Sequence, residues 1–490
     1  MTITRRQMLQ ALSAGVLGAV SAPALLLPRE VRAAVTPFSL PLNIPPVLTP
    51  TSTTATADYY DLQIREAYAE IIPGQQTRII GFNGMTPGPT IRARAGRQTV
   101  MSHYNGLPPT TLWNTPGNCT IHLHGGHIPA SEDGYPTDYI RPGMTRSYTY
   151  PNNQLPTMLW YHDHCMDFTG PHVWYGMAGL YLLSDDYEDS LGLPNGACEV
   201  PLVLQDRNFD TSGQLVYTRN RMMGEQGNTM LVNSTIQPYF NVATRRYRFR
   251  ILNGANARFY RLALSNGASF QVIGMEGGLL PKPVTVTSLT LAPAERADIV
   301  IDFGSLAVGT KVELRNTLVS STNSVYKVMS FNVNRKETDP SKVPATLRPI
   351  TKLDPAKSVV TRNFSISMMM MGGGMGGMGD PMWVINGLGF DANRIDAFPK
   401  LGTTEIWRFT NRSGMAHPIH MHDVQFQILD INGVAPAATH AGWKDVVIVP
   451  AMGSASIVAK FEDYTGLYMF HCHMLEHEDY MAMAQFKVVA

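Results

Sequence analysis

The residues best suited to chemistry gather in the stretch "FHCHMLEHEDYMAM", residues 470–483. The thiol of Cys472 lies between the imidazoles of His471 and His473, and another imidazole, His477, follows five residues after the thiol. The whole chain has only 4 cysteines and 14 histidines, so this density is unusual. Thiolate and imidazole are the ligands that zinc and copper prefer. The stretch therefore predicts a metal site.

Three further segments contain closely spaced histidines. They are His122 with His124, His162 with His164, and the run His417, His420 and His422. On a β-strand, residues i and i+2 point to the same face, so each His-x-His pair aims two imidazoles into one space. The 4 pairs in this sequence predict a site with 8 converging imidazoles.

Strand alternation also gives Cys472 a separate role. Its side chain must point away from those of His471 and His473, so one strand serves two metal sites back to back. His417 and His477 can join Cys472 in the two-histidine, one-cysteine set of a blue-copper site. A short covalent path then links the two sites for electrons.

Two simpler interpretations compete with this one. A single His-x-His pair is common in protein cores, and zinc is the usual metal for cysteine with histidine. Four pairs and a cysteine do not fit a closed four-ligand zinc site, so we predict a multi-copper assembly. The histidines outside these clusters are expected to be loop or surface residues; they are His103, His127, His172 and His440.

A methionine-rich segment covers residues 368–382, "MMMMGGGMGGMGDPM". Its thioethers belong to Met368, Met369, Met370, Met371, Met375, Met378 and Met382. A flexible linker is one interpretation, but linkers of that kind normally use serine with glycine. Thioether sulfur is a soft ligand suited to Cu(I), so we favour Cu(I) handling.

Short β-rich runs separated by glycine, proline and asparagine must position these ligands. Residues 247–252, 259–264 and 446–449 are examples, and long helical periodicity is scarce. The pattern predicts an all-β protein of sandwiches or barrels. Shifts in composition predict three domains, at residues 35–188, 189–345 and 346–490.

Composition excludes some partners. Only 16% of residues are charged and the net charge is +1, so neither nucleic acid nor an anionic membrane is expected as a partner. A monomer is expected. Cys119, Cys165 and Cys198 are scattered, which predicts at most one disulfide with one thiol left free.

Residues 1–34 have the features of an export signal. Arg5 and Arg6 precede an apolar run and a small-residue cleavage site around Ala33, which resembles a twin-arginine signal. A membrane anchor is the alternative, but Ser13, Gly15 and other small or helix-breaking residues interrupt the run. We expect a periplasmic or extracellular protein without a stable membrane anchor once the signal is removed.

The four histidine motifs, in this order and over essentially the whole mature chain, resemble those of the multicopper oxidases. "IHLHGGHIPASEDGYP" and "LWYHDHCM" are most similar to the spore-coat laccase and bilirubin oxidase branch. The methionine-rich segment before "VINGLGFD" resembles the periplasmic cuprous oxidases. The resemblance implies three cupredoxin-like Greek-key β-sandwich domains and four copper ions.

The resemblance also implies which residue binds which copper ion. Type 1 copper takes His417, Cys472 and His477, and type 2 copper takes His122 and His420. The type 3 ions take the two remaining sets, which are His124, His162 and His473, and His164, His422 and His471.

The type 1 site departs from the family at one position. An axial methionine usually follows the last histidine by five residues, and here that position is Ala482, between Met481 and Met483. Either the type 1 copper lacks a thioether, which raises its potential, or a local distortion brings Met481 or Met483 into place. We favour the first interpretation.

Two acids match positions that the family uses for proton supply. Glu478 follows the ligand His477, and Asp133 lies nine residues after His124. Reduction of dioxygen to water consumes four protons, which carboxylic acids near a buried cluster can deliver. The alternative for each is a solvated loop acid or a carboxylate that orients a histidine.

Together these features predict an exported, laccase-like copper oxidoreductase. It removes single electrons from phenols, aromatic amines or Cu(I) and reduces dioxygen to water. The alternatives are a cuprous oxidase dedicated to copper tolerance, a copper store that uses only the methionine segment, and a non-catalytic copper-binding cupredoxin protein. A two-domain copper nitrite reductase would have fewer histidine pairs.

Overall fold

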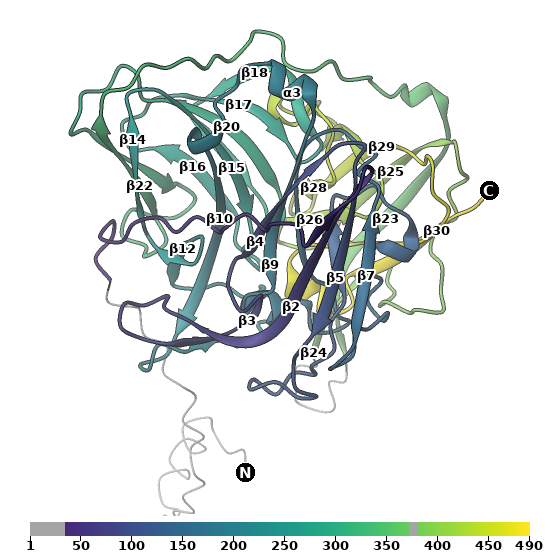
Figure 1. Ribbon diagram of the computed structural model, residues 1–490. Coiled ribbons are helices and arrows are strands. Elements are labelled where there is room, and N and C mark those ends of the chain that lie inside the picture. Colours follow the sequence, from purple (N-terminus) through teal and green to yellow (C-terminus); the bar gives the residue numbers. More distant parts are fainter. Residues whose placement is uncertain (1–34, 372–379) are drawn as a thin grey trace, which may run out of the picture.

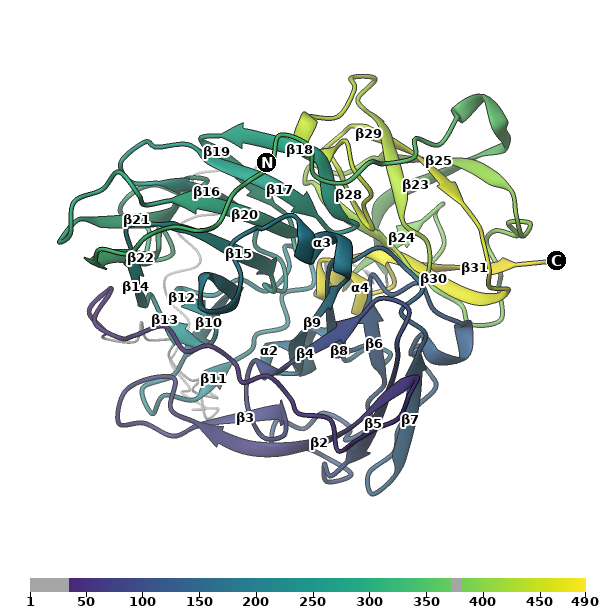
Figure 2. The ribbon, with the colours of Figure 1, turned by 45° about the horizontal axis from the view of Figure 1, so that its top comes forward.

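The computed structural model describes residues 35–371 and 380–490, and β-strands dominate it. The strands form three pairs of sheets, coloured purple to blue, teal to green, and green to yellow along the chain (Figures 1 and 2). The all-β prediction is confirmed. Residues 1–34, with the predicted export signal, and 372–379, with Met375 and Met378, lie outside the described residues.

The first domain forms two sheets, with strand order β1-β2-β5-β7 (β3 on β2) and β4-β9-β8-β6. Its strands are β1 (Ser52–Thr53), β2 (Ala57–Ala69), β3 (Thr77–Phe82), β4 (Gly88–Arg94), β5 (Gln98–Asn105), β6 (Ile121–His124), β7 (Thr145–Tyr150), β8 (Met158–Asp163) and β9 (Ala178–Ser184). The 3₁₀ helix η1 (Ala130–Glu132) follows β6, and α2 (Thr169–Trp174) lies between β8 and β9.

The second domain has one sheet in the order β13-β12-β10-β15-β20-β17-β18 (β11 on β10) and another in the order β14-β22-β21-β16-β19. Its strands are β10 (Glu199–Phe209), β11 (Leu215–Val216), β12 (Thr229–Val232), β13 (Thr235–Ile236), β14 (Tyr239–Ala243), β15 (Arg246–Asn253), β16 (Tyr260–Leu264), β17 (Phe270–Met275), β18 (Gly278–Val286), β19 (Ser288–Leu291), β20 (Arg296–Asp302), β21 (Lys311–Asn316) and β22 (Lys327–Arg335). Helices α3 (Asp186–Ser190) and η2 (Gly196–Cys198) lead into it.

The third domain has the sheets β24-β23-β25-β29-β27 and β28-β26-β30-β31. Its strands are β23 (Ser358–Met371), β24 (Asp380–Ile385), β25 (Thr404–Asn411), β26 (His417–Met421), β27 (Phe426–Ile431), β28 (Val446–Val449), β29 (Ser454–Lys460), β30 (Gly466–Cys472) and β31 (Met483–Val488). Its helices are η3 (Pro355–Lys357), η4 (Ala438–His440) and α4 (Leu475–Asp479).

Each of the predicted ranges 35–188, 189–345 and 346–490 contains one pair of sheets. The boundary placed at residue 188 falls inside α3, and the boundaries themselves stay a prediction.

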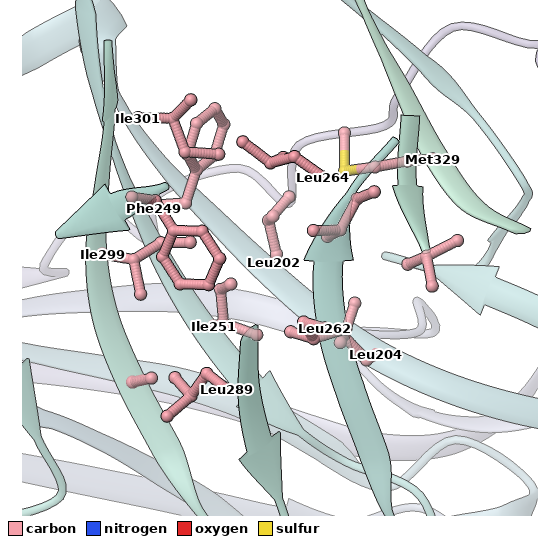
Figure 3. Close-up of a cluster of buried hydrophobic side chains, with 14 of the residues drawn as sticks. Leu202, Leu204, Phe249, Ile251, Leu262, Leu264, Leu289, Ile299, Ile301 and Met329 are labelled. Carbon is pink, nitrogen blue, oxygen red and sulfur yellow. The ribbon is translucent and has the colours of Figure 1, made fainter. Parts of the chain in front are cut away.

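A separate hydrophobic core fills each domain. In the second domain, side chains that alternate along β15, such as Phe249 and Ile251, meet Leu202 from β10 and Leu262 from β16 (Figure 3). All four are at most 1% exposed. Burial of one such side chain contributes about 1.5–3 kcal/mol, so a core of many such residues stabilises each sandwich.

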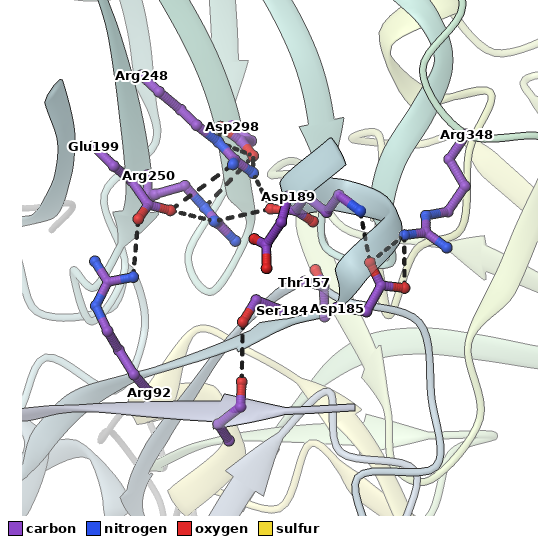
Figure 4. A network of polar contacts seen from close by, with 12 residues as sticks. Arg92, Thr157, Ser184, Asp185, Asp189, Glu199, Arg248, Arg250, Asp298 and Arg348 are labelled. Carbon is purple, nitrogen blue, oxygen red and sulfur yellow. Dashed lines mark hydrogen bonds and ion pairs between the residues drawn. The ribbon is translucent and has the colours of Figure 1, made fainter. Parts of the chain in front are cut away.

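The three domains also share contacts. A small cluster joins Trp160 of β8, Val203 of β10 and Val446 of β28 at the point where the domains meet. A polar network links β20 and β15 of the second domain to α3, through Asp298, Arg248 and Glu188 (Figure 4). The apolar cluster thus joins all three domains, and the polar network ties α3 to the second.

Within the described ranges, no helix is long and apolar enough to span a membrane. The cysteines Cys119, Cys165, Cys198 and Cys472 are all buried free thiols. The single disulfide that the sequence allowed is therefore not formed.

Candidate metal centre

The histidine pairs lie on strands or directly after them, as the strand argument requires. His122 and His124 are on β6, and the partner of His122 across the sheet is His162 on β8. In the third domain, His420 on β26 pairs with His471 on β30. Residues directly opposite on neighbouring antiparallel strands share a face, so both sheets present their histidines to the same gap between the domains.

Eight imidazoles converge there, four from each of the two domains. They belong to His122, His124, His162, His164, His420, His422, His471 and His473, each at most 1% exposed. The Nε2 atoms of His122 and His420 are 3.4 Å apart, and the Nε2 atom of His422 lies 3.3 Å from that of His164 and 3.2 Å from that of His471. The ring of His473 meets the ring of His124 edge-on, with centroids 4.9 Å apart.

In three of these histidines, a backbone carbonyl binds the ring nitrogen that points away from the cluster. The Nδ1 atoms of His122, His162 and His420 each donate to a backbone carbonyl at 2.8 Å, those of Asp133, Asp163 and Asp445 respectively. That contact fixes the proton on Nδ1 and leaves the lone pair of Nε2 directed into the cluster.

The two acids predicted for proton supply lie against these rings. Asp133 accepts a hydrogen bond from His422 Nδ1 at 2.7 Å, and its other oxygen is 3.4 Å from His122 Nδ1. The Glu478 carboxylate lies between His164 and His471, 3.2 and 3.1 Å from their Nδ1 atoms. Both acids are at most 2% exposed. Each therefore bridges a histidine of the first domain and one of the third.

Burial also sets the protonation of the histidines. It holds the pKa of His124, His162 and His164 well below the ordinary value, and the neighbouring imidazoles lower it further. The pKa of His420, His422 and His473 is lowered for the same reasons. Neutral imidazoles are the form that binds metal.

A second, smaller set lies on the opposite face of β30. The Sγ atom of Cys472 is 3.3 Å from His417 Nδ1 and 3.7 Å from His477 Nδ1, and those two nitrogens are 3.3 Å apart. The Nε2 atoms of the two rings have other partners. His417 Nε2 lies 2.8 Å from the Ser413 hydroxyl, and His477 Nε2 lies 3.3 Å from the Met222 carbonyl. The three ligand atoms therefore face one point.

This set is sealed from water. Trp383 stacks on His477 with ring centroids 4.1 Å apart and meets His417 edge-on at 4.6 Å, while its indole N–H donates to the Arg221 carbonyl. Burial lowers the pKa of His417 to about 4 and raises the pKa of the Cys472 thiol. A metal must therefore displace the thiol proton when it binds.

Ala482, the residue in the usual axial register, lies beside Cys472. The backbone N–H of Cys472 donates to the Ala482 carbonyl, and both side chains lie in the same core cluster. Met483 pairs with His471 and so shares the opposite face. Met481 has a positive φ of 79° and lies beside Gly389, near the Met382 sulfur.

Comparison with known proteins decides the family. Multicopper oxidase sequence families match residues 63–188, 212–310 and 354–490. The chain is 34% identical to a laccase of Bacillus stratosphericus, over 91% of this chain and 98% of that one, and 35% identical to a bilirubin oxidase of Albifimbria verrucaria, over 92% and 81%. A crystal structure of a laccase from Pediococcus acidilactici superimposes with a TM-score of 0.84 at 31% identity, covering 94% of this chain and 96% of that one.

The chain belongs to the multicopper oxidases. It is a laccase-like, copper-dependent oxidoreductase with dioxygen as electron acceptor, and its sandwiches are cupredoxin-like. A multicopper oxidase needs copper, and the residues present fit it. Thiolate with imidazole suits copper in the smaller set. In the larger set, His162 Nε2 and both nitrogens of His473 are buried without a hydrogen-bond partner among the described residues, as atoms reserved for a metal would be.

Some residues around this multicopper oxidase site were not predicted from the sequence. Asp445 lies 3.2 Å from His124 Nε2, and Asp163 accepts a hydrogen bond from His172 Nδ1 at 2.9 Å. A lone aspartate next to a strand belongs to no spacing pattern. The sequence hint here is that the charged pair "KD" directly precedes the apolar run of β28. The prediction of loop or surface positions was wrong for His172 and also for His103, which are both at most 1% exposed.

The methionine-rich segment of the oxidase is partly in regular structure. Met368, Met369 and Met370 lie on β23 and are 39–42% exposed. Met371 ends β23, and Met368 pairs with Trp383 on β24, the residue that covers His417 and His477. Met382 precedes that tryptophan. The exposed thioethers are thus attached to a hairpin that reaches the smaller metal set.

Proposed function

We propose that this oxidase binds four copper ions in the arrangement implied by its motifs. The type 1 ligands are His417, Cys472 and His477, and the type 2 ligands are His122 and His420. One type 3 ion binds His124, His162 and His473, and the other binds His164, His422 and His471. The convergence of these side chains supports the assignment.

The observation that carries the proposal is the arrangement around the end of β30. Cys472 faces the smaller set, and the adjacent His471 and His473 face the larger one. Electrons that reach the thiolate therefore have a path of a few covalent bonds to the eight-histidine cluster. When bound, copper supplies one-electron acceptance at the first set and the four-electron reduction of dioxygen to water at the second.

Asp133 and Glu478 would handle protons at this cluster. Each carboxylate lies beside the Nδ1 atoms of two histidines, where it holds those rings and can pass protons inward. Both roles, orientation and proton supply, are compatible with these contacts.

We propose phenols and aromatic amines as the principal electron donors. The names of the relatives, laccase and bilirubin oxidase, support this class. Cu(I) is a second candidate donor, because exposed thioethers at Met368, Met369 and Met370 are soft ligands close to the covered type 1 set. Copper tolerance is the biological role that oxidation of Cu(I) would serve.

We further propose that the protein is exported to the periplasm, or beyond it, by the twin-arginine route, and that it acts as a monomer without a membrane anchor. The support is the arginine pair and the apolar run in residues 1–34. Replacement of Arg5 and Arg6 by lysine should retain the protein in the cytoplasm, as fractionation and immunoblotting would show. Unchanged export would contradict the route.

Oxygen consumption by the copper-loaded protein tests the choice of donor. A bulky phenol and Cu(I) are compared in the wild type and in a variant with leucine at Met368, Met369 and Met370. Leucine keeps the apolar strand, whereas deleting the segment would remove the pairing partner of Trp383. Selective loss of Cu(I) oxidation would establish the methionine route. Equal phenol oxidation in both proteins, with no preference for Cu(I), would leave the phenol as donor and the methionines as structure.

A further inference from the structure

An ion pair that lies outside the predicted ligand set contacts the larger cluster. Asp445 precedes β28 in the third domain, and Arg296 begins β20 in the second. We infer that Asp445, held by Arg296, is a positioning residue that turns His124 so that Nδ1, not Nε2, faces the cluster. The inference rests on the proposed assignment of His124 as a copper ligand.

The ring of His124 is oriented differently from its neighbours. Its Nε2 atom lies 3.2 Å from Asp445 Oδ1, and its Nδ1 atom is buried with no hydrogen-bond partner in the part of the chain that the structure describes. In His122, His162 and His420 it is Nδ1 that donates to a protein acceptor. A carboxylate that accepts the Nε2 proton fixes this tautomer and leaves the Nδ1 lone pair for the metal.

Arg296 holds that carboxylate in place. Its two terminal nitrogens donate to the two Asp445 oxygens at 2.7 and 2.5 Å, and its Nε atom donates to the Met158 carbonyl on β8 at 2.9 Å. Only arginine presents such a rigid fork of donors. One side chain of the second domain thus contacts both domains that supply the histidines.

The backbone beside His124 leaves room for the pair. Gly125 has a positive φ of 82°, and a Cβ atom there would lie 2.4 Å from Asp445 Oδ2 and 2.5 Å from Arg296 Nη2. Asp445 also accepts the Nδ1 proton of His420 through its backbone carbonyl at 2.8 Å. Asp445 therefore anchors one histidine from each side of the cluster.

The charges explain why both partners are needed. Arg296 and Asp445 have side chains only 1% exposed. The guanidinium of Arg296 is the cation that pairs with the Asp445 carboxylate, and a buried charge without such a partner is strongly disfavoured. Loss of such a partner typically weakens metal binding about ten- to hundredfold.

The test measures copper retention against a chelator, together with the near-ultraviolet absorption of the type 3 pair and the blue absorption of the thiolate site. Asp445→Ala should lose type 3 absorption and bind cluster copper about ten- to hundredfold more weakly, with blue absorption kept. Asp445→Asn retains an oxygen acceptor and should recover part of the loss.

Asp298→Ala is the matched control. Asp298 is buried and accepts hydrogen bonds from Arg248 at 2.9 Å (Figure 4). The Asp298→Ala variant should have a lower melting temperature but unchanged copper retention. Equal copper loss in both variants, or full retention in Asp445→Ala, would overturn the inference.

Two further variants separate the possible failures. His124→Ala must lose type 3 absorption; if it does not, the ligand assignment itself fails. Loss in His124→Ala without loss in Asp445→Ala overturns only the positioning role. If Asp445→Ala does not fold, Arg296→Lys keeps a buried cation but no fork, and unchanged copper retention in it would equally contradict the inference.

Discussion

At the level of single residues, the cluster histidines differ in what holds their outer nitrogen. Backbone carbonyls hold His122 and His162, whereas the carboxylates of Asp133 and Glu478 lie against His422 and His471. A carbonyl can only orient a ring, but a carboxylate can also exchange a proton. Proton supply is therefore expected from the carboxylate side of the cluster.

Glu478→Gln should slow reoxidation by dioxygen and leave reduction of the type 1 set unchanged. The amide keeps the shape of the side chain but cannot carry a proton inward. Stopped-flow absorption of the blue band resolves the two half-reactions. Glu476→Gln is the control, because Glu476 is equally buried on α4 and contacts Tyr217, Asn256 and the Glu225 backbone instead of the cluster. Equal slowing of both half-reactions would reject the role of Glu478.

Ala482→Met should lower the reduction potential of the type 1 set. The Ala482 side chain is fully buried in the cluster that contains Cys472, so a thioether there would reach the axial position. An axial sulfur stabilises the oxidised ion. Redox titration of the blue absorption gives the potential, with Ala484→Met, on the adjoining strand β31, as a control. A rise or no change would contradict the axial role of position 482.

At the level of elements, much of the site could be predicted from strand alternation. Paired histidines on β6 and β30, with Cys472 on the other face, follow from a period of two residues. The contacts between Asp445 and Arg296 could not be predicted, because the two residues are 149 positions apart in the sequence. His172 was misplaced because α2 is too short to show helical periodicity, so its burial against Asp163 left no pattern.

The strand β24 brings an unpredicted aromatic cover to the type 1 set. Trp383 is 2% exposed and excludes water from His417 and His477. An apolar cover disfavours the more highly charged oxidised ion and so raises the potential. Trp383→Ala should therefore lower the reduction potential, while Trp383→Phe should stay close to the wild type. Potentiometry measures the reduction potential of both variants. An unchanged potential in Trp383→Ala would contradict the role of the aromatic cover.

At the level of the whole molecule, an ion pair links the first and third domains away from the copper cluster. His127 lies 3.0 Å from Asp423 and 3.1 Å from Asp463, with its side chain 16% exposed. Burial lowers its pKa, but the hydrogen bonds and charges of Asp423 and Asp463 outweigh burial and raise the pKa to about 9. The ordinary value is 6.5.

The sign of the effect follows from that raised pKa. The contribution of His127 to stability is complete below pH 6.5 and is lost as pH rises through about 9. His127→Gln should melt a few degrees below the wild type at neutral pH, and the difference should shrink above pH 9. His440→Gln is the control for calorimetry, since burial lowers the pKa of His440 to about 4 and it stays neutral throughout. A difference that persists at high pH would contradict the charged pair.

The position of the last ligands along the chain has a consequence for biosynthesis. Translation proceeds from the N-terminus, and residues 471–477 follow every other proposed ligand. The first two domains can complete their own cores while neither copper set can yet exist. Metal loading must then await synthesis of β30 and α4, and a ribosome that stops before them releases a chain with most of its fold but no means of holding a complete set of copper ions.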